Sequence, residues 1–469
     1  MDMVTDGVLD FKSLEKEIFR QCCCLARLQL KEQLETLDDS IMQHRNKKIY
    51  RYISRRAGTI KTIMGEVSFE RVYYRKNCGD SVKYVYLLDE VLGLDTQCGL
   101  FSETLAENVV EQCMNMSFRK AANSISRMTG QTISHGGAWN ILQNAGETLE
   151  KRERRLVELN EKEVLHGDIE TKVLFSEVDG VWLSMQGKDR PKKIGKREIK
   201  IGTYYRGWEI TGKDRVETVD KIAYAGFDDS LQFQKRREAQ LALYYDTDEI
   251  EFRIQNADGA SWIRNSDEDV IEQLDPFHRS SAIMQWMPGK ENKTKAFQFI
   301  RGKDVEGLLL FVLATRNSSE LQDVRLKLDK LYKYFSGNRD KLLTWKERGI
   351  DLPPPPDGIE YKSLGTQEHS NSDIITHRMK RRKASWSKQG ASHMAKLLCQ
   401  RVTMENVGSD IILYKNDSDA PIFPVLSAAQ SPTSCGKGKV SAPQHGRWPF
   451  ENTSVTNGRK AIRNLFEYK

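Results

Sequence analysis

The sequence has no CxxC pair, although it contains eight cysteines. Cys22, Cys23 and Cys24 are consecutive, and the other five are scattered along the chain. A structural zinc site needs closely spaced thiolate pairs, and a disulfide framework belongs to short secreted chains. We therefore expect reduced thiols and no zinc site.

The chain also lacks a long apolar run and a secretory signal. Its longest apolar stretch, 305–315, is interrupted by Glu306 and is too short to span a bilayer. The N-terminal sequence MDMVTDGVLDFK has no basic segment followed by an apolar one. With 39% hydrophobic and 30% charged residues, the composition is that of a globular protein. We expect a soluble, cytoplasmic protein with no membrane partner.

Positive charge exceeds negative charge by only 7, but it is concentrated in two runs. The first covers 188–200, and the second, 378–383, reads RMKRRK. Such runs are complementary in charge to nucleic-acid phosphates, although a solvated loop is an alternative for the first. The residues that we expect to bind DNA here are Lys192, Lys193, Lys196, Arg197, Arg378, Lys380, Arg381, Arg382 and Lys383.

The N-terminal third changes its hydrophobic period twice. Helical spacing over 11–45 predicts a helix, and a period near two over 59–74 predicts a hairpin with its turn at 64–66. A third strand is expected at 82–88.

Two helices, 117–129 and 133–143, then flank a short turn that contains Gly130. This order is typical of a helix-turn-helix, although plain helical hairpins have the same pattern. The charged segment 146–163 is expected to be a helical connector. Candidate phosphate-binding residues here are Arg119, Lys120, Arg127 and the group Arg51, Arg55 and Arg56.

The centre of the chain is α/β. We expect a strand at 172–178, a turn at Asp179-Gly180, a return strand at 181–185 and a third strand at 198–205. A helix (229–245) and a fourth strand (251–255) follow. This is the order of a ribonuclease H-like mixed sheet. An all-helical insertion from about 279 would precede the linker at the prolines 353–356.

Three carboxylates are candidates for the chemistry. Asp179 and Asp258 each follow a predicted strand and precede a glycine, and these two strands are neighbours in such a sheet. A strand-final Asp-Gly is also an ordinary turn. Glu368 would lie in the first turn of a later helix that starts at Gly365 and Thr366, before the second basic run. Carboxylate oxygens suit Mg²⁺, which takes phosphate oxygens as further ligands. The basic residues that follow would attract the nucleic-acid backbone.

These sequences resemble those of a known family. The segments SEVDGVW, IQNADGASWI, LDPFH, GTQEHSNSD and RMKRRKASWS are similar to DDE transposases of bacterial insertion sequences. The group in question is catalogued as an uncharacterised protein family and is more distantly similar to Mutator-like transposases. The resemblance is strong from about 165 to 400. It implies a ribonuclease H-like catalytic fold, two Mg²⁺ or Mn²⁺ ions held by Asp179, Asp258 and Glu368, and terminal inverted repeats as the DNA partner.

The wider family places an acid and a histidine after the second Asp, which Asp275 and His278 match as auxiliary residues. His278 would position a phosphate or water, or else cap a helix. The resemblance further implies DNA strand cleavage and strand transfer, a homo-oligomer on DNA, and association with the nucleoid. Two alternatives stay open: a ribonuclease H-like nuclease without joining activity, and a non-catalytic DNA-binding protein derived from a transposase.

The expected domains are a DNA-binding region (1–163), a catalytic core in two parts (164–278 and 359–402), the helical insertion (279–358) and a C-terminal tail (403–469).

Overall fold

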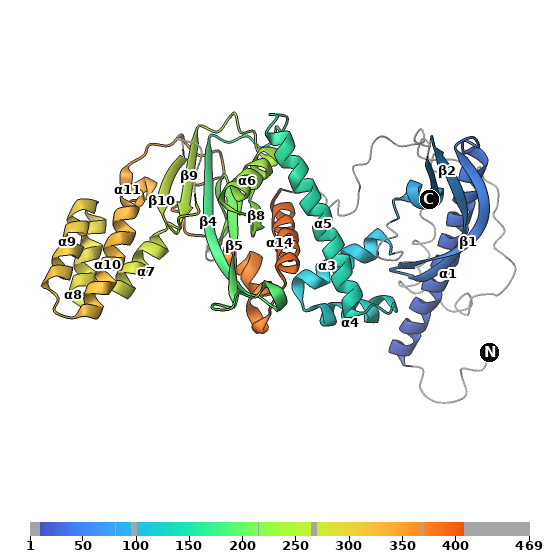
Figure 1. The fold of residues 1–469 in the computed structure, drawn as a ribbon, viewed down its shortest axis with the longest axis horizontal. Helices are drawn as coiled ribbons and strands as arrows, with labels where there is room; N and C mark the ends of the chain where they lie inside the picture. Colours follow the sequence, from blue (N-terminus) through green and yellow to red (C-terminus); the bar gives the residue numbers. More distant parts are fainter. Residues whose placement is uncertain are drawn as a thin grey trace, which may run out of the picture. The chain divides into compact units, whose positions relative to one another are not determined.

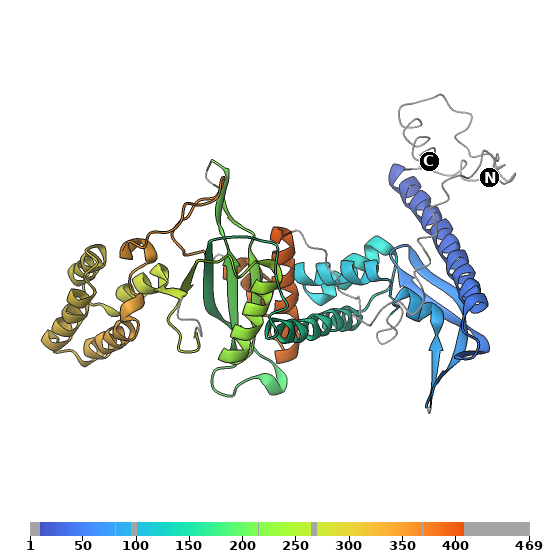
Figure 2. The same cartoon turned by 90° about the horizontal axis from the view of Figure 1, so that it is seen from above.

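A long helix packed on a three-stranded antiparallel sheet begins the described part of the chain. The computed structural model describes residues 10–79, 81–94, 101–213, 215–263, 270–366 and 370–407. Figure 2 shows the sheet against helix α1 (Phe11–His44). The strands β1 (Tyr50–Thr62), β2 (Gly65–Cys78) and β3 (Ser81–Tyr86) are adjacent in that order. The predicted helix, hairpin and third strand are confirmed, except that 87 and 88 begin helix α2 (Leu87–Leu92).

Three helices follow this sheet: α3 (Glu103–Asn115), α4 (Phe118–Thr129) and α5 (His135–Asn160). Gly130 ends α4 with φ +67°, and the Ser134 side chain accepts a hydrogen bond from the Gly137 N–H at the start of α5. The predicted pair of helices and its turn are confirmed. The second helix does not stop at Gln143 but continues through the segment expected to be a connector.

The central sheet has five strands in the order β10-β9-β4-β5-β8, which Figure 1 shows side by side. Strand β5 is antiparallel to both of its neighbours, β4 and β8, and β9 and β10 run parallel to β4. The predicted mixed α/β architecture is confirmed at this level. The strands are β4 (Val173–Ser184), β5 (Lys196–Tyr205), β8 (Ile222–Gly226), β9 (Phe252–Ala257) and β10 (Val270–Leu274), and a separate hairpin is formed by β6 (Gly207–Gly212) and β7 (Arg215–Val219).

The predicted turn at Asp179-Gly180 is wrong, because strand β4 runs straight through it. Asp179 pairs with Ile201 and Gly180 with Lys200 on β5. A Cβ at Gly180 would meet the carboxylate of Glu198, whose side chain would have to move aside. The structure thus shows close packing at Gly180 and no turn.

Helices cover both faces of the sheet. Helix α6 (Ser230–Tyr244) packs with Leu174 and Tyr204, whose side chains point to one face. The other face contacts helix α14 (Lys388–Val407), and the Thr403 hydroxyl accepts a hydrogen bond from the Ala223 N–H of β8. One hydrophobic core joins this face to α3, α4 and α5. The helix pair at 118–160 therefore shares its core with the central sheet.

The segment after β10 is helical, as predicted, and has its own core. Figure 1 shows α7, α8, α9 and α10 as one group beyond strand β10. These helices are α7 (Pro276–Trp286), α8 (Lys290–Arg301), α9 (Val305–Ser318) and α10 (Gln322–Gly337), followed by η2 (Arg339–Lys341) and α11 (Trp345–Arg348). Across the described ranges, each helix is too short or too polar to cross a membrane.

Before α14 the chain forms short helical pieces. A π-helical turn, η3 (Ser372–Thr376), is followed by α13 (His377–Met379) and η4 (Arg381–Lys383). The 3₁₀ turn η1 (Gly187–Asp189) lies between β4 and β5. Helix α14 extends to Val407, and the rest of the expected tail lies outside the described residues.

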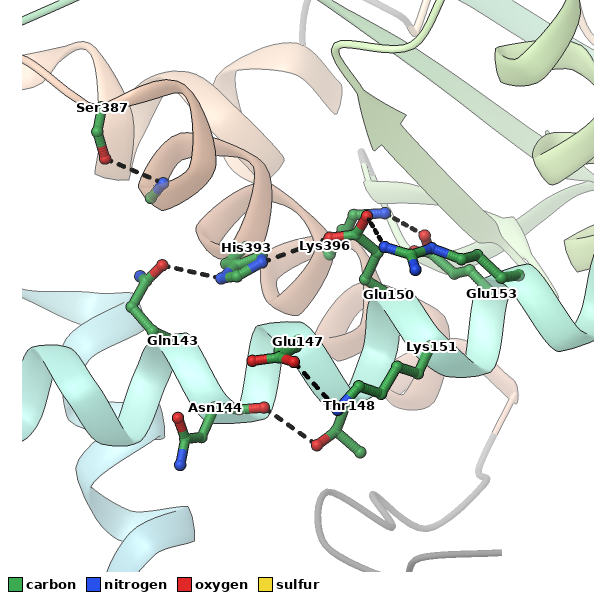
Figure 3. Close-up of polar contacts among 12 residues, drawn as sticks. Gln143, Asn144, Glu147, Thr148, Glu150, Lys151, Glu153, Ser387, His393 and Lys396 are labelled. Atoms are coloured by element: carbon green, nitrogen blue, oxygen red, sulfur yellow. Dashed lines mark hydrogen bonds and ion pairs between the residues drawn. The ribbon is translucent and has the colours of Figure 1, made fainter. Parts of the chain in front are cut away.

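Buried polar contacts join α5 to α14 (Figure 3). His393 lies between Gln143 and Glu150, with its Nδ1 atom 2.8 Å from the Gln143 Oε1 and its Nε2 atom 3.5 Å from the Glu150 Oε2. One turn further along, Lys396 forms an ion pair with Glu153, and both side chains are buried. Burial raises the pKa of Glu153, against the effect of the Lys396 and Arg236 charges.

Replacing Lys396 by Met is expected to lower the free energy of unfolding by about 3–5 kcal/mol, because Glu153 would be left buried with weaker compensation. Urea unfolding followed by circular dichroism measures this loss. Lys151→Met is the matched control, because Lys151 forms an exposed ion pair with Glu147 on α5, the helix that also carries Glu153. This control substitution should change the free energy of unfolding by less than about 0.5 kcal/mol. Equal effects of the two substitutions would contradict the importance of the buried pair.

Candidate active site

Three aspartates form a row across three parallel strands. The last paired residues are Val178 with Ala257, and Ala257 with Leu274. The next residues along β4, β9 and β10 are Asp179, Asp258 and Asp275. Parallel strands in register place such residues side by side. The sheet therefore brings the three aspartates together on the side toward the carboxyl ends of β9 and β10. The predicted proximity of Asp179 and Asp258 is confirmed, with Asp179 inside a strand and not at its end.

Asp179 is 7% exposed. Its Oδ1 atom accepts a hydrogen bond from the Gly180 N–H at 2.7 Å, and its Oδ2 atom accepts one from the Asn371 amide. Burial raises the pKa of Asp179 to about 6, and repulsion by the Asp258 carboxylate acts in the same direction. The Gly180 N–H, His278 and Asn371 oppose this rise in pKa. Asp179 is thus a carboxylate whose negative charge lacks full compensation.

Asp258 begins the loop after β9. Its Oδ1 atom accepts a hydrogen bond from the Ala260 N–H at 2.8 Å, while its backbone oxygen accepts one from the Tyr334 hydroxyl at 2.8 Å. Burial raises the pKa of Asp258, and the negative charge of Asp275 adds to this, against His278. Since Tyr334 belongs to α10, the helical insertion directly holds the backbone of this site.

Asp275 and His278, the expected auxiliary residues, have different positions. Asp275 is buried, caps α7 by accepting a hydrogen bond from the Phe277 N–H, and accepts another from the Asn256 amide at 2.9 Å. The helix cap is therefore Asp275 and not His278. His278 lies half-buried in the first turn of α7, where it acts electrostatically on both Asp179 and Asp258.

Glu368, the expected third carboxylate, lies outside the described residues. The residues on either side of the gap contact strand β4. The Thr366 N–H donates to the Glu177 Oε1 atom at 3.1 Å, and Asn371 donates to Asp179. The Ser370 N–H also donates to the Thr366 carbonyl at 2.8 Å.

Three further polar residues of the site were missed in the sequence. Glu198 on β5 has its pKa raised by burial and by the charge of Asp258. Asn371 contacts Asp179, and the fully buried Glu177 accepts hydrogen bonds from Thr366 and from the Tyr205 hydroxyl. Only the alternation of side chains along β4 signals Glu177, because it points to the same face as Asp179.

The chain segments beside the two basic runs are hydrogen-bonded to each other. The Gln186 N–H donates to the Trp386 carbonyl at 2.8 Å, and the Lys388 N–H donates to the Asp189 carboxylate at 2.9 Å. Arg378 is held by the fold: it donates to the Cys113 carbonyl and lies over the rings of Phe118 and Trp386. Of the residues expected to bind DNA in these runs, the following are exposed: Lys192, Lys193, Lys196, Arg197, Lys380, Arg381 and Lys383. The side chain of Arg382 lies outside the described part.

The basic residues of the first helix in the helix pair, Arg119, Lys120 and Arg127 on α4, are exposed. They are available to a partner, whereas the apolar side of α4 (Ala121, Ala122, Ile125) is buried in the shared core.

The donor chemistry of the site fits a divalent cation. Asp179 and Asp258 offer oxygen ligands, and their mutual repulsion would be relieved by a bound positive charge. In the ranges that the structure describes, these two are not part of a group of three or more His, Cys, Asp or Glu side chains arranged around one metal position.

The fold and site define an α/β protein with two neighbouring carboxylates, the buried Asp179 and the half-buried Asp258, on adjacent parallel strands of a mixed sheet. The chain belongs to the uncharacterised protein family UPF0236, whose family model matches residues 4–409. The expected membership of a family of this description is confirmed.

Relatives are similar over most of their length. The UPF0236 protein in the vanSb 3′ region of Streptococcus gallolyticus is 28% identical over 419 residues, covering 87% of this chain and 84% of that protein. A UPF0236 protein of Caldanaerobacter subterraneus subsp. tengcongensis is 24% identical over 426 residues, covering 86% and 79%. A second protein of that strain, 23% identical over 422 residues and covering 86% and 78%, has a name that combines eleven loci.

Asp179→Asn is expected to stabilise the metal-free protein. The folded-state pKa of Asp179, about 6, lies above the value of 3.8 for an unperturbed carboxyl. Ionisation therefore costs folding free energy as the pH rises from about 4 to about 6, and an amide avoids that cost. Urea unfolding in EDTA should show the Asp179→Asn variant more stable by about 1–3 kcal/mol at pH 7.5 and by little at pH 4. A less stable variant at pH 7.5 would contradict the repulsion between the two aspartates.

Proposed function

We propose that this protein is the DNA transposase of an insertion sequence, which binds terminal inverted repeats and catalyses metal-dependent strand cleavage and strand transfer. The observation that carries the proposal is the parallel pairing of β4 with β9, which puts Asp179 beside Asp258. Asn371, from the helix that follows Glu368 in sequence, reaches the same carboxylate.

The sheet supports a ribonuclease H-like catalytic core. Three antiparallel strands are followed by a helix and two further strands parallel to the first, in the spatial order β8-β5-β4-β9-β10. The helical insertion after β10 and the return of the chain to β4 at Thr366 fit such a core interrupted before its last acidic helix.

We assign Asp179 and Asp258 to one Mg²⁺ or Mn²⁺ ion and Asp179 with Glu368 to the other. Two such ions would activate water or a 3′-hydroxyl and would stabilise the leaving oxygen. His278, close to both aspartates, would orient a phosphate or water. The basic runs and α4 would hold the DNA backbone, whose binding by cations releases counterions.

The relative whose name combines eleven loci of one genome also supports the proposal, because a mobile element multiplies within its host genome. As a transposase the protein would act on DNA in the cytoplasm, at the nucleoid, and as a homo-oligomer that holds both ends of its element.

The test is a strand-transfer assay. Purified full-length protein is incubated with Mg²⁺, a target plasmid and labelled DNA from both flanks of its gene, and scrambled flanks serve as the control. Nicking at the flank ends and covalent joining to the plasmid are expected. Cleavage without joining would favour a nuclease, and specific binding without either reaction would favour a non-catalytic DNA-binding protein.

A further inference from the structure

One face of the N-terminal sheet combines tyrosines with arginines. In β2, alternate residues Arg71, Tyr73 and Arg75 point to the same face. Their partners on β3 are Tyr86, opposite Tyr73, and Tyr84, opposite Arg75. Residues that are directly opposite one another in a ladder share a face, so all these side chains gather on one side of the sheet.

Strand β1 adds two more arginines to this face. Arg56 is opposite Arg71, and Arg51 is opposite Arg75. A register shift between Tyr52 and Ser54 inserts one residue, which brings Arg51 and Arg56 to the same face. Arg55 points to the other face and pairs with Asp39 of α1. The arginine group seen in the sequence is thus divided by the sheet.

The aromatic rings on this face are already in contact. Tyr73 and Tyr84 are stacked, with ring centroids 5.7 Å apart and 17° between their planes, whereas Tyr86 lies 4.9 Å from Tyr73 with its ring tilted by 42°. The Arg56 guanidinium carbon lies 3.9 Å from the Tyr73 centroid. Tyr84, at the outer end of the stack, is 57% exposed. Rings ordered in advance lose little conformational freedom when a further flat group stacks on them.

The charge of this face is positive. Arg71 is neutralised by its buried ion pair with Asp89 of α2. Arg51, Arg56 and Arg75 are exposed, and within the part of the chain that the structure describes they form no ion pair with a carboxylate. Three cations around an exposed ring stack are complementary to bases joined by phosphates.

We propose that this tyrosine–arginine face binds single-stranded DNA, with an unpaired base stacked on Tyr84 and phosphates held by Arg51, Arg56 and Arg75. The proposal rests on the proposed function in taking DNA as the partner. Single strands are favoured because bases in a duplex are covered on both sides by their neighbours, whereas an unpaired base offers a free face.

Binding of a fluorescein-labelled 20-nucleotide oligothymidylate to the full-length protein, measured by anisotropy in EDTA, tests the proposal without requiring cleavage. Tyr84→Ala is expected to weaken binding by roughly 5- to 150-fold, the usual loss for one stacked base. Tyr84→Phe keeps the ring and should bind within about twofold of the unmodified protein. Tyr52→Ala is the matched control, because Tyr52 is 45% exposed on the other face of the same sheet.

The arginines give a second readout. Arg56→Gln and Arg75→Gln should each lower the slope of log affinity against log salt by about 0.7, the value for one phosphate contact on a single strand. Arg55→Gln, on the other face, should leave the slope unchanged. An oligonucleotide containing 5-iodouracil should crosslink on irradiation to the peptide that contains Tyr84.

Equal affinities of Tyr84→Ala and Tyr52→Ala would overturn the proposal, as would a crosslink confined to other peptides. The proposal would also be overturned if the corresponding duplex bound as tightly as the single strand and if Tyr84→Ala weakened duplex binding by the same factor. Tyr84-dependent binding in a protein that neither cleaves nor joins DNA would reject the transposase while leaving this site. Normal transposition combined with unchanged oligothymidylate binding by Tyr84→Ala would reject the single-strand site and keep the transposase.

Discussion

Asp179→Asn, Asp258→Asn and Glu368→Gln are each expected to reduce DNA cleavage and joining by about 10³-fold or more. Each substitution keeps the shape of the side chain and removes a charge that holds the cation. The effects should not add, because the three carboxylates are proposed to act as one unit, so a double variant should be no worse than either single one. Cleavage and joining of labelled end DNA are measured at saturating Mg²⁺.

Two controls separate this loss from general damage. Glu147→Gln removes an exposed carboxylate on α5 and should retain full activity. Asp179→Asn should at the same time unfold at a higher urea concentration in EDTA, which a misfolded variant would not do. Near-normal activity in any one of the three variants would remove that residue from the proposed site.

The sheet shows how far the sequence predicted the fold. Three strands, a helix and a further strand were expected in this order and are present, but the three strands are not formed by the three predicted segments. Segment 181–185, predicted as a separate strand, continues β4, while β8, a short strand of small residues, was not predicted. An Asp-Gly pair inside a strand has the same local sequence as one in a turn. Only the Glu198 side chain packed over Gly180, from another strand, distinguishes the two.

Helix α5 shows a similar limit. The highly charged segment 146–163 was expected to be a helical connector. In the structure some of those charges, such as Glu153, are buried against Lys396 on a segment more than 200 residues away in sequence. Long-range partners of this kind leave no periodic signal near the residue that they satisfy.

The sequence predicted some of the residues and contacts of the site but not others. Asp179 and Asp258 could be paired because the strands that carry them were expected to be neighbours in the sheet, which is a property of the fold class. The contacts of Asn371 with Asp179 and of Thr366 with Glu177 depend on how the chain returns after the helical insertion. The tyrosine–arginine face depends on a single inserted residue in β1, which reverses the side to which Arg51 points.

The metal requirement has an equally large expected effect. Removal of divalent cations with EDTA should abolish cleavage and joining, and Mg²⁺ or Mn²⁺ should restore them. Oxygen ligands from carboxylates suit both ions, whereas Ca²⁺ takes more ligands in a looser geometry and should bind without supporting the reaction. DNA binding should persist in EDTA, because the basic runs and the N-terminal sheet are separate from the carboxylates.

A measurement without DNA isolates the site itself. Mg²⁺ should raise the thermal unfolding temperature of the unmodified protein, because the cation replaces the repulsion between Asp179 and Asp258 with attraction to both, and ligand binding stabilises only the folded state. Asp179→Asn, already relieved of that repulsion, should gain much less from Mg²⁺. Full activity after exhaustive dialysis against EDTA, or the same Mg²⁺ shift in both proteins, would rule out a cation held by these two aspartates.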